Sequence, residues 1–116
     1  MQRLNRILIS ALVLAAGCTM PPASKATVTF LNNSGEEIQN LEVAVSGAQL
    51  HASQIASASS TTLSFVPGSG SGYTINVEFR SGRRLRVEDV GYVSTGLTVD
   101  DKFEITSDGI QELIPK

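Results

Sequence analysis

The residue in this chain with the most informative chemistry is Cys18, its only cysteine. A thiol can serve as a nucleophile, a metal ligand, a disulfide partner or a point of covalent attachment. Because there is no second cysteine, an intramolecular disulfide is excluded. A free thiol in an exported protein would also be open to oxidation or cross-linking. The residues around Cys18 therefore decide which chemistry its sulfur serves.

Other residue types that could support catalysis or metal binding are few. His51 is the only histidine, and a zinc site needs three or four nitrogen, sulfur or carboxylate ligands. The acidic pairs at 88–89 and 100–101 lack the closely spaced oxygen donors of a calcium loop. No base and nucleophile stand in a recognisable arrangement. We expect a surface or loop histidine, no metal, no cofactor and no enzymatic activity.

A cluster of arginines is the only basic cluster in the chain after residue 18, and it consists of Arg80, Arg83, Arg84 and Arg86. One interpretation is a patch for an anionic partner, such as lipid headgroups, phosphate groups of lipopolysaccharide or an acidic protein face. The other is a solvated hairpin whose charges discourage edge-to-edge aggregation. The sequence leaves both open.

Residues 67–72 form a glycine- and serine-rich segment with glycine at every second position. This spacing is not the dinucleotide-binding pattern, and a strand rather than a helix is expected to follow it, so no helix N-terminus could hold a phosphate. A flexible surface loop is predicted. The glycine-bounded segment 91–96 has two interpretations, a conformationally special loop that touches a ligand and a strand-edge turn with Tyr92 packed on the core. We expect the second.

From residue 26 onward, apolar residues alternate with polar ones, which is typical of half-buried β-strands. The segments with this period are 28–30, 41–45, 63–65, 73–79, 85–87 and 103–105. Weaker strands are predicted near 92–99 and 110–114, and residues 48–58 are interpreted as a crossover with Leu50 and Ile55 facing inward. Glycine and asparagine turns punctuate the segments. The pattern predicts an all-β fold, an antiparallel β-sandwich of seven or eight short strands.

The hairpin at Ser81-Gly82 allows a prediction of register. Phe79 and Leu85 must face the same side of the sheet, so they pair directly or with an even offset. Direct pairing would put Glu78 opposite Arg86 on the outer face, where an exposed ion pair contributes at most about 1 kcal/mol.

Residues 1–17 have the layout of a secretory signal peptide. Arg3 and Arg6 precede an apolar run at 7–17, interrupted only by one serine. A bilayer-spanning helix needs about 20 apolar residues, whereas a signal peptide needs a run of roughly 7–15. Leu14-Ala15-Ala16-Gly17 then leads into Cys18 with small residues. This arrangement resembles the lipobox of bacterial lipoproteins, although Ala15 stands where the family most often has leucine.

The resemblance implies a cleaved, helical signal peptide at 1–17 and a mature N-terminus at Cys18. In that family the cysteine carries a diacylglycerol on sulfur and an acyl chain such as palmitate on its amine. Three acyl chains would anchor the protein stably in a membrane, whereas a single chain binds reversibly. Thr19, rather than aspartate, follows the cysteine, which in the enterobacterial sorting pattern favours the outer membrane over the inner.

The expected organisation is a signal peptide at 1–17, a lipidated N-terminus and tether at 18–26, and one β-sandwich domain at 27–116. Removal of residues 1–17 from the 116-residue chain leaves 99 residues. Two of the nine basic residues go with the signal peptide, so seven basic and eleven acidic residues remain, a net charge of −4. This charge argues against nucleic acid as a partner. The eight residues at 19–26 span at most roughly 26 Å.

The mature domain resembles the small immunoglobulin-like or transthyretin-like sandwiches of bacterial envelope lipoproteins in architecture, without a motif specific to one family. This implies a non-enzymatic envelope protein, anchored by lipid and facing the periplasm, that binds an envelope partner or has a structural role. The alternative is a periplasmic inhibitor or immunity-type protein acting through the loop at 67–72. Ser69-Gly70-Ser71-Gly72-Tyr73 is similar to the inhibitory loop of membrane-bound lysozyme inhibitors, but their usual further cysteine pair is absent here.

Overall fold

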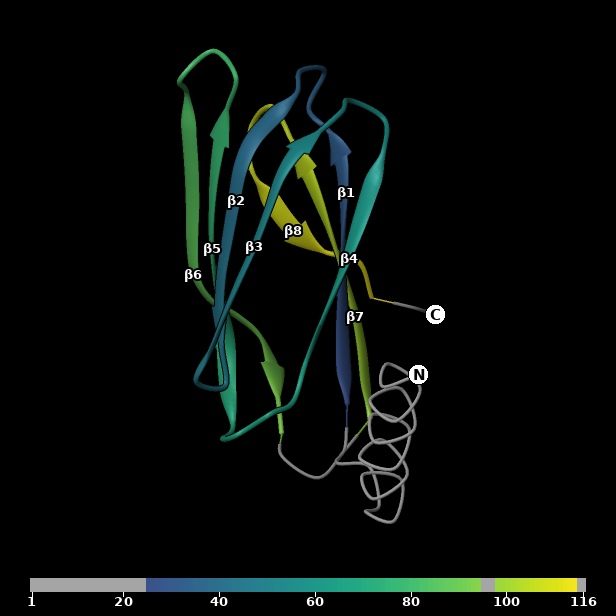
Figure 1. Ribbon diagram of the computed structural model, residues 1–116, viewed down its shortest axis with the longest axis vertical. Helices are drawn as coiled ribbons and strands as arrows, with labels where there is room; N and C mark the ends of the chain where they lie inside the picture. The colour runs from purple at the N-terminus through teal and green to yellow at the C-terminus, as the bar shows by residue number, and fades with distance from the viewer. Residues whose placement is uncertain (1–24, 95–97, 115–116) are drawn as a thin grey trace, which may run out of the picture.

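The computed structural model describes residues 25–94 and 98–114, which form eight β-strands in two four-stranded sheets (Figure 1). The all-β sandwich predicted from the alternating pattern is confirmed. Cys18, the signal peptide and most of the tether lie outside the described residues. The strands are β1 (Ala26–Asn33), β2 (Ile38–Val45), β3 (Ala48–Ile55), β4 (Ser60–Phe65), β5 (Ser71–Phe79), β6 (Arg84–Val93), β7 (Val99–Thr106) and β8 (Ile110–Glu112).

One sheet has the strand order β4-β1-β7-β8 and the other has the order β3-β2-β5-β6. All neighbouring strands are antiparallel except β1 and β7, which run parallel with Ala26 beside Val99 and Phe30 beside Phe103. The expected antiparallel pattern therefore fails at this one pair. A short hairpin forces its two strands to be antiparallel, but β1 and β7 are far apart in sequence and no such turn joins them.

The core lies between the two sheets and is made by the inward-facing residues of each alternating strand. Phe103 of β7 stacks on Phe30 of β1 with ring centroids 5.6 Å apart, and Tyr73 of β5 meets Phe103 edge-on at 5.0 Å. The last contact joins the two sheets. Other fully or nearly fully buried apolar side chains include Val28, Ile38, Leu41, Val43, Ile75, Val77, Phe79, Val93 and Ile105.

Three strand predictions need correction. The segment interpreted as a crossover at 48–58 contains β3, an eight-residue strand in which Ile55 is buried and Leu50 is half-buried. The weak strand expected near 92–99 is not a separate element, because 92–93 end β6 and residue 99 begins β7. The closing strand is shorter than expected and ends at residue 112.

The β5–β6 hairpin keeps the predicted parity but not the direct pairing. Leu85 pairs with Val77, so the offset is two residues and Glu78 lies opposite Arg84 rather than Arg86. The turn is closed by the Phe79 amide, which donates to the Arg83 carbonyl at 2.8 Å. Gly82, with φ of 95°, supplies the left-handed conformation that this tighter turn requires.

The sandwich has two ends with different connections (Figure 1). We call the end at which β1 begins the proximal end. The β2–β3 turn, the β4–β5 loop and the last residues of β6 also lie there. At the distal end lie the turns between β1 and β2, β3 and β4, β5 and β6, and β7 and β8. An eight-residue strand such as β1 separates these ends by about 25 Å. None of the described segments is a helix of the length and apolarity needed to cross a bilayer.

Candidate functional site

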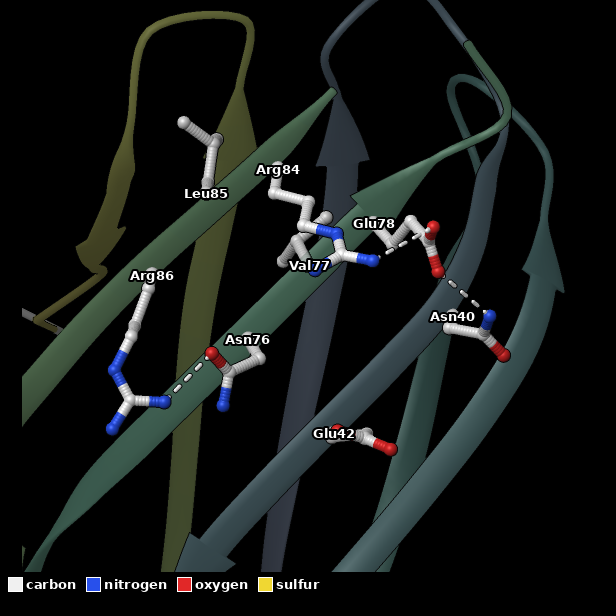
Figure 2. A pocket seen from close by; sticks show the side chains of 8 residues that line it. All are labelled: Asn40, Glu42, Asn76, Val77, Glu78, Arg84, Leu85 and Arg86. Atoms are coloured by element: carbon white, nitrogen blue, oxygen red, sulfur yellow. Dashed lines mark hydrogen bonds and ion pairs between the residues drawn. The ribbon is translucent and has the colours of Figure 1, made fainter. Parts of the chain in front are cut away.

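The outer face of β2, β5 and β6 carries an open, polar concavity of about 550 Å³ (Figure 2). Strand alternation produces this surface, since the inward side chains of these strands fill the core while their neighbours face away from it. The concavity is lined by Asn40, Glu42, Asn76, Val77, Glu78, Arg84, Leu85 and Arg86.

A row of polar contacts crosses this sheet from edge to edge. Arg84 of β6 pairs with Glu78 of β5 at 3.5 Å, and Glu78 accepts a hydrogen bond from the Asn40 side chain of β2 at 3.1 Å (Figure 2). The side-chain oxygen Oδ1 of Asn40 in turn lies 3.3 Å from Nε2 of His51 on β3. His51 is exposed on a strand, so this row is a surface network with no buried group.

Arg86 lies one pleat further along β6 and faces the same way. Its Nη1 donates to the Asn76 side chain at 2.8 Å (Figure 2). Its Nε and Nη2 both donate to one oxygen of Glu88, at 2.8 and 2.6 Å. The guanidinium groups of both β6 arginines therefore lie at the rim of the concavity, and each already makes contacts with neighbouring side chains. Glu42, on the other side of it, has no cationic partner within the described residues.

The other two arginines of the predicted cluster lie at the distal end instead. Arg80 pairs with Glu37 at 3.5 Å and its side chain is 76% exposed. Arg83 packs over the Phe79 ring at 4.4 Å, donates to the Ser107 carbonyl at 2.8 Å and pairs with Glu36 at 3.4 Å. Arg83 therefore ties three distal turns together, and its main role is structural.

The structure thus splits the arginine cluster and pairs each of its members with a glutamate. Each of the four arginines has a glutamate within 3.5 Å, so the cluster and its partners carry no net charge together. Only Arg84 and Arg86 share one surface, the outer face of β6. A surface that carries both arginine and glutamate side chains suits a partner with complementary polar groups better than a uniformly anionic one.

The loop at 67–72 is held in place rather than free. Ser46, in the β2–β3 turn, donates from its hydroxyl to the Ser69 carbonyl at 2.6 Å and from its amide to the Ser71 hydroxyl at 2.7 Å. The Gly68 amide donates to the Ser46 carbonyl at 3.2 Å. On the opposite side, the Tyr92 hydroxyl lies so close to Gly70 that a β-carbon there would overlap it. The predicted flexible loop is therefore a constrained one.

Two buried polar groups were not singled out by the sequence pattern. Asn32, fully buried in β1, donates through Nδ2 to the carbonyls of Glu36, Ile55 and Ala56. Tyr73 donates to Asp101 at 2.7 Å. Burial, the hydrogen bond to Asp101 and the negative charges of Asp101 and Glu112 raise the pKa of Tyr73 above its usual range. Both groups join elements of the fold and neither lines the concavity.

The acidic pairs also have structural partners. Asp100 accepts a hydrogen bond from Thr27 at 2.9 Å, and Glu88 is paired with Arg86. Within residues 25–94 and 98–114, no group of three or more histidine, cysteine or acidic residues is placed to hold a metal ion.

Comparison with known proteins gives a likeness of fold only. No family model matches the chain, and no curated protein matches it. Among solved structures, the NMR structure of a protein from Eubacterium rectale superposes with a TM-score of 0.62 at 20% sequence identity. The match covers 80% of this chain and 90% of the other. The sandwich is thus similar to a known fold.

Proposed function

We propose that this protein is a lipid-anchored envelope protein that binds another envelope component and has no enzymatic activity. The observation that carries the proposal is the lone Cys18 behind a charged start, a short apolar run and small residues. Its acyl chains would hold the protein at the periplasmic side of the outer membrane. Residues 19–26, eight in all, form a short tether between Cys18 and the sandwich. Because this tether would keep the domain close to the membrane, it supports a membrane-bound partner.

Metabolic labelling with palmitate, followed by fractionation, tests the anchor. We expect the natural protein and a Thr19→Ala control to take up label and to sediment with membranes, and Cys18→Ala to do neither. Thr19→Asp should move the labelled protein from the outer to the inner membrane in a density gradient. Membrane association of Cys18→Ala equal to that of the natural protein would show that no lipid anchor exists.

The outer face of β2, β5 and β6 is the surface we propose for the partner. It combines donors on Arg84 and Arg86 with acceptors on Glu42 and Asn76 around one concavity. An interface of this kind is specific because a wrong partner would leave charged groups unpaired.

Affinity capture from detergent-solubilised envelopes tests this surface. The double variant Arg84→Glu with Arg86→Glu should lose the captured envelope protein, and the natural interaction should weaken with salt. The matched control is Lys25→Glu with Lys102→Glu, which changes the net charge equally at the start of β1 and in β7, both of the other sheet. Equal capture by both double variants would remove the outer face from the proposal.

A periplasmic inhibitor acting through residues 67–72 is the second candidate. The observation that favours it is the fixation of this loop by Ser46, because a loop held in one conformation loses little entropy on binding an enzyme. Against it, the tyrosine of the inhibitor-like segment, Tyr73, is buried in the core. Capture of a hydrolase or toxin that Ser69→Arg abolishes and Arg84→Glu leaves intact would favour this candidate.

A further inference from the structure

Large apolar side chains exposed on the described part of the chain are few and unevenly placed. They are Val66, Tyr92, Leu113 and Ile114. Two of them, Val66 at 55% exposure and Tyr92 at 66%, lie at the proximal end, and Leu113 and Ile114 follow β8 on the flank. The four distal turns carry none, within the described residues. Tyr92 also contradicts the expectation that it packs on the core.

The fold places both side chains at the end of the sandwich where β1 begins. Val66 follows Phe65, which pairs with Ala26, the first residue of β1. Tyr92 precedes Val93, which pairs with Ser71 at the end of the β4–β5 loop, and its hydroxyl lies against Gly70 of that loop. The β4–β5 loop therefore lies between the two exposed side chains, and its hydrogen bonds to Ser46 hold it in place.

The chain leads from this same end toward Cys18. Lys25 is the first described residue, and the residues at 19–26 reach at most roughly 26 Å when fully extended. If Cys18 is acylated, its acyl chains lie in the bilayer and the proximal end cannot lie further from the membrane surface than this. The distal end begins about 25 Å beyond the proximal end.

We propose that the proximal end of the sandwich rests on the bilayer, with Val66 and Tyr92 in contact with the lipid interface. This inference depends on the proposed lipid anchor and adds an orientation to it. Tyrosine is enriched at this depth of a membrane because its ring is apolar and its hydroxyl stays hydrated. The sandwich then stands upright, with its distal turns pointing away from the membrane, and the loop at 67–72 faces lipid.

The charges at the proximal end indicate that the contact is apolar rather than electrostatic. Lys25 and Asp100 are exposed there with opposite signs, and Asp89, which lies against Gly72, is exposed as well, so positive charge does not predominate. Such a surface gains little from anionic headgroups, so zwitterionic lipid should serve as well. Two partly exposed side chains are also too small an area to hold a protein on a membrane without acyl chains.

Single-tryptophan reporters test the orientation, because the natural chain has no tryptophan. The variants are Val66→Trp and Tyr92→Trp at the proximal end, with Ser81→Trp at the distal end as the matched control. Each acylated, full-length product is reconstituted into phosphatidylcholine vesicles whose acyl chains carry bromine, with and without phosphatidylglycerol. Vesicle flotation and palmitate labelling report on the anchor, and fluorescence quenching reports on the orientation.

We expect all three variants to float, with loss of emission and a blue shift for Val66→Trp and Tyr92→Trp only, in both lipid mixtures. Flotation with no quenching at either proximal position, or with quenching equal to that of Ser81→Trp, overturns the orientation and leaves the anchor intact. Quenching that requires phosphatidylglycerol overturns the apolar contact. Absence of both acylation and flotation overturns the anchor, and the orientation with it.

Discussion

Asn32 joins more segments than any other buried polar residue that the structure describes. Its Nδ2 donates to carbonyls of the β1–β2 turn and of the β3–β4 connection, and its Oδ1 accepts from the Ser34 amide and hydroxyl. Where these two connections approach β1, the Asn32 side chain supplies hydrogen bonds to their backbone that the regular strand-to-strand pattern does not. Asn32 itself is fully buried and its hydrogen bond to the Ile55 carbonyl is buried, so these groups would be costly to leave without a partner, whereas its other hydrogen bonds are partly buried.

Replacement of Asn32 by alanine should therefore lower the free energy of unfolding by about 2–4 kcal/mol, because it removes the side-chain donor to the buried Ile55 carbonyl and the links to the carbonyls of Glu36 and Ala56. The control is Asn33→Ala, which removes an exposed hydrogen bond to Glu104 and should change stability by no more than about 0.5 kcal/mol. Urea denaturation of both variants makes the comparison. Equal midpoints would contradict the role assigned to Asn32.

Tyr73 should make the stability of the protein depend on pH in the alkaline range. Burial, the bond to Asp101 and the nearby carboxylates raise its pKa, so the folded chain keeps a proton that the unfolded chain loses above its ordinary pKa of about 10. Stability is unaffected by this group below that pH and falls as the pH rises beyond it. The effect is expected in urea titrations compared between about pH 8 and about pH 11.

The substitution Tyr73→Phe separates this effect from other alkaline titrations. It should lower stability near neutral pH by about 1–2 kcal/mol, because Asp101 loses a donor. It should also make the alkaline loss of stability smaller than in the natural protein. Tyr92→Phe, at an exposed tyrosine, is the control and should keep the natural pH profile. An unchanged alkaline loss in Tyr73→Phe would assign that loss to other groups.

At the scale of elements, two glycines of the same region should respond differently to substitution. A β-carbon at Gly72, in β5, would lie 2.6 Å from the Asp89 carboxylate and 3.1 Å from the Asp89 backbone. The Asp89 backbone belongs to a bulge of β6 and has a positive φ of 56°, so it has little freedom to move. A β-carbon at Gly70 would meet the far end of the exposed Tyr92 side chain, which can rotate away.

We therefore expect Gly72→Ala to destabilise the protein by about 1–3 kcal/mol and Gly70→Ala by less than about 1 kcal/mol. Thermal unfolding of the two variants measures the difference. The double variant Gly70→Ala with Tyr92→Ala should recover any loss that Gly70→Ala causes, since it removes the overlapping ring. A larger effect at Gly70 than at Gly72 would contradict this account.

The elements that the sequence predicted well are those with regular alternation of large apolar residues, such as β5 and the start of β6. β3 was missed because its inward side chains are mostly small, with Ala48 and Ala52 on either side of Leu50. The sequence predicts a separate segment at the end of β6 because two bulges interrupt the alternation of that strand. Neither the parallel β1–β7 pair nor the sheet partners follow from a local pattern.

The candidate site was predictable only in part for a similar reason. Adjacent arginines were recognisable as a basic cluster, but the hairpin turn places Arg83 against Phe79 and leaves Arg84 and Arg86 on the outer face. Their glutamate partners come from both nearby and distant positions in the sequence. The cross-strand partner Glu78 depends on the register of the β5–β6 hairpin, which differs by two residues from the direct pairing that the sequence predicts. Asn32 stands in the sequence Asn-Asn-Ser-Gly, which is typical of a turn, and its burial cannot be predicted locally because it depends on contacts with distant connections.

At the scale of the whole molecule, the two sheets depend on each other through a few aromatic contacts. Phe103 touches Phe30 within its own sheet and Tyr73 in the opposite sheet, and Tyr73 meets Phe65 edge-on at 6.3 Å. With one cysteine, no disulfide supplements this core within a chain. A domain of this size is typically stable by only about 5–15 kcal/mol, so one large cavity removes much of its stability.

We expect Phe103→Ala to cost about 3–5 kcal/mol and Phe103→Leu considerably less, because leucine fills most of the space. The two sheets should respond together, since Phe103 contacts both. Native-state hydrogen exchange distinguishes this from local damage by following the amides of Val43 in β2 and Phe30 in β1. In Phe103→Ala, the protection of both should fall by a similar factor. If Val43 kept its natural protection while Phe30 lost its own, the sheets would be separate cooperative units and the aromatic contact would not couple them.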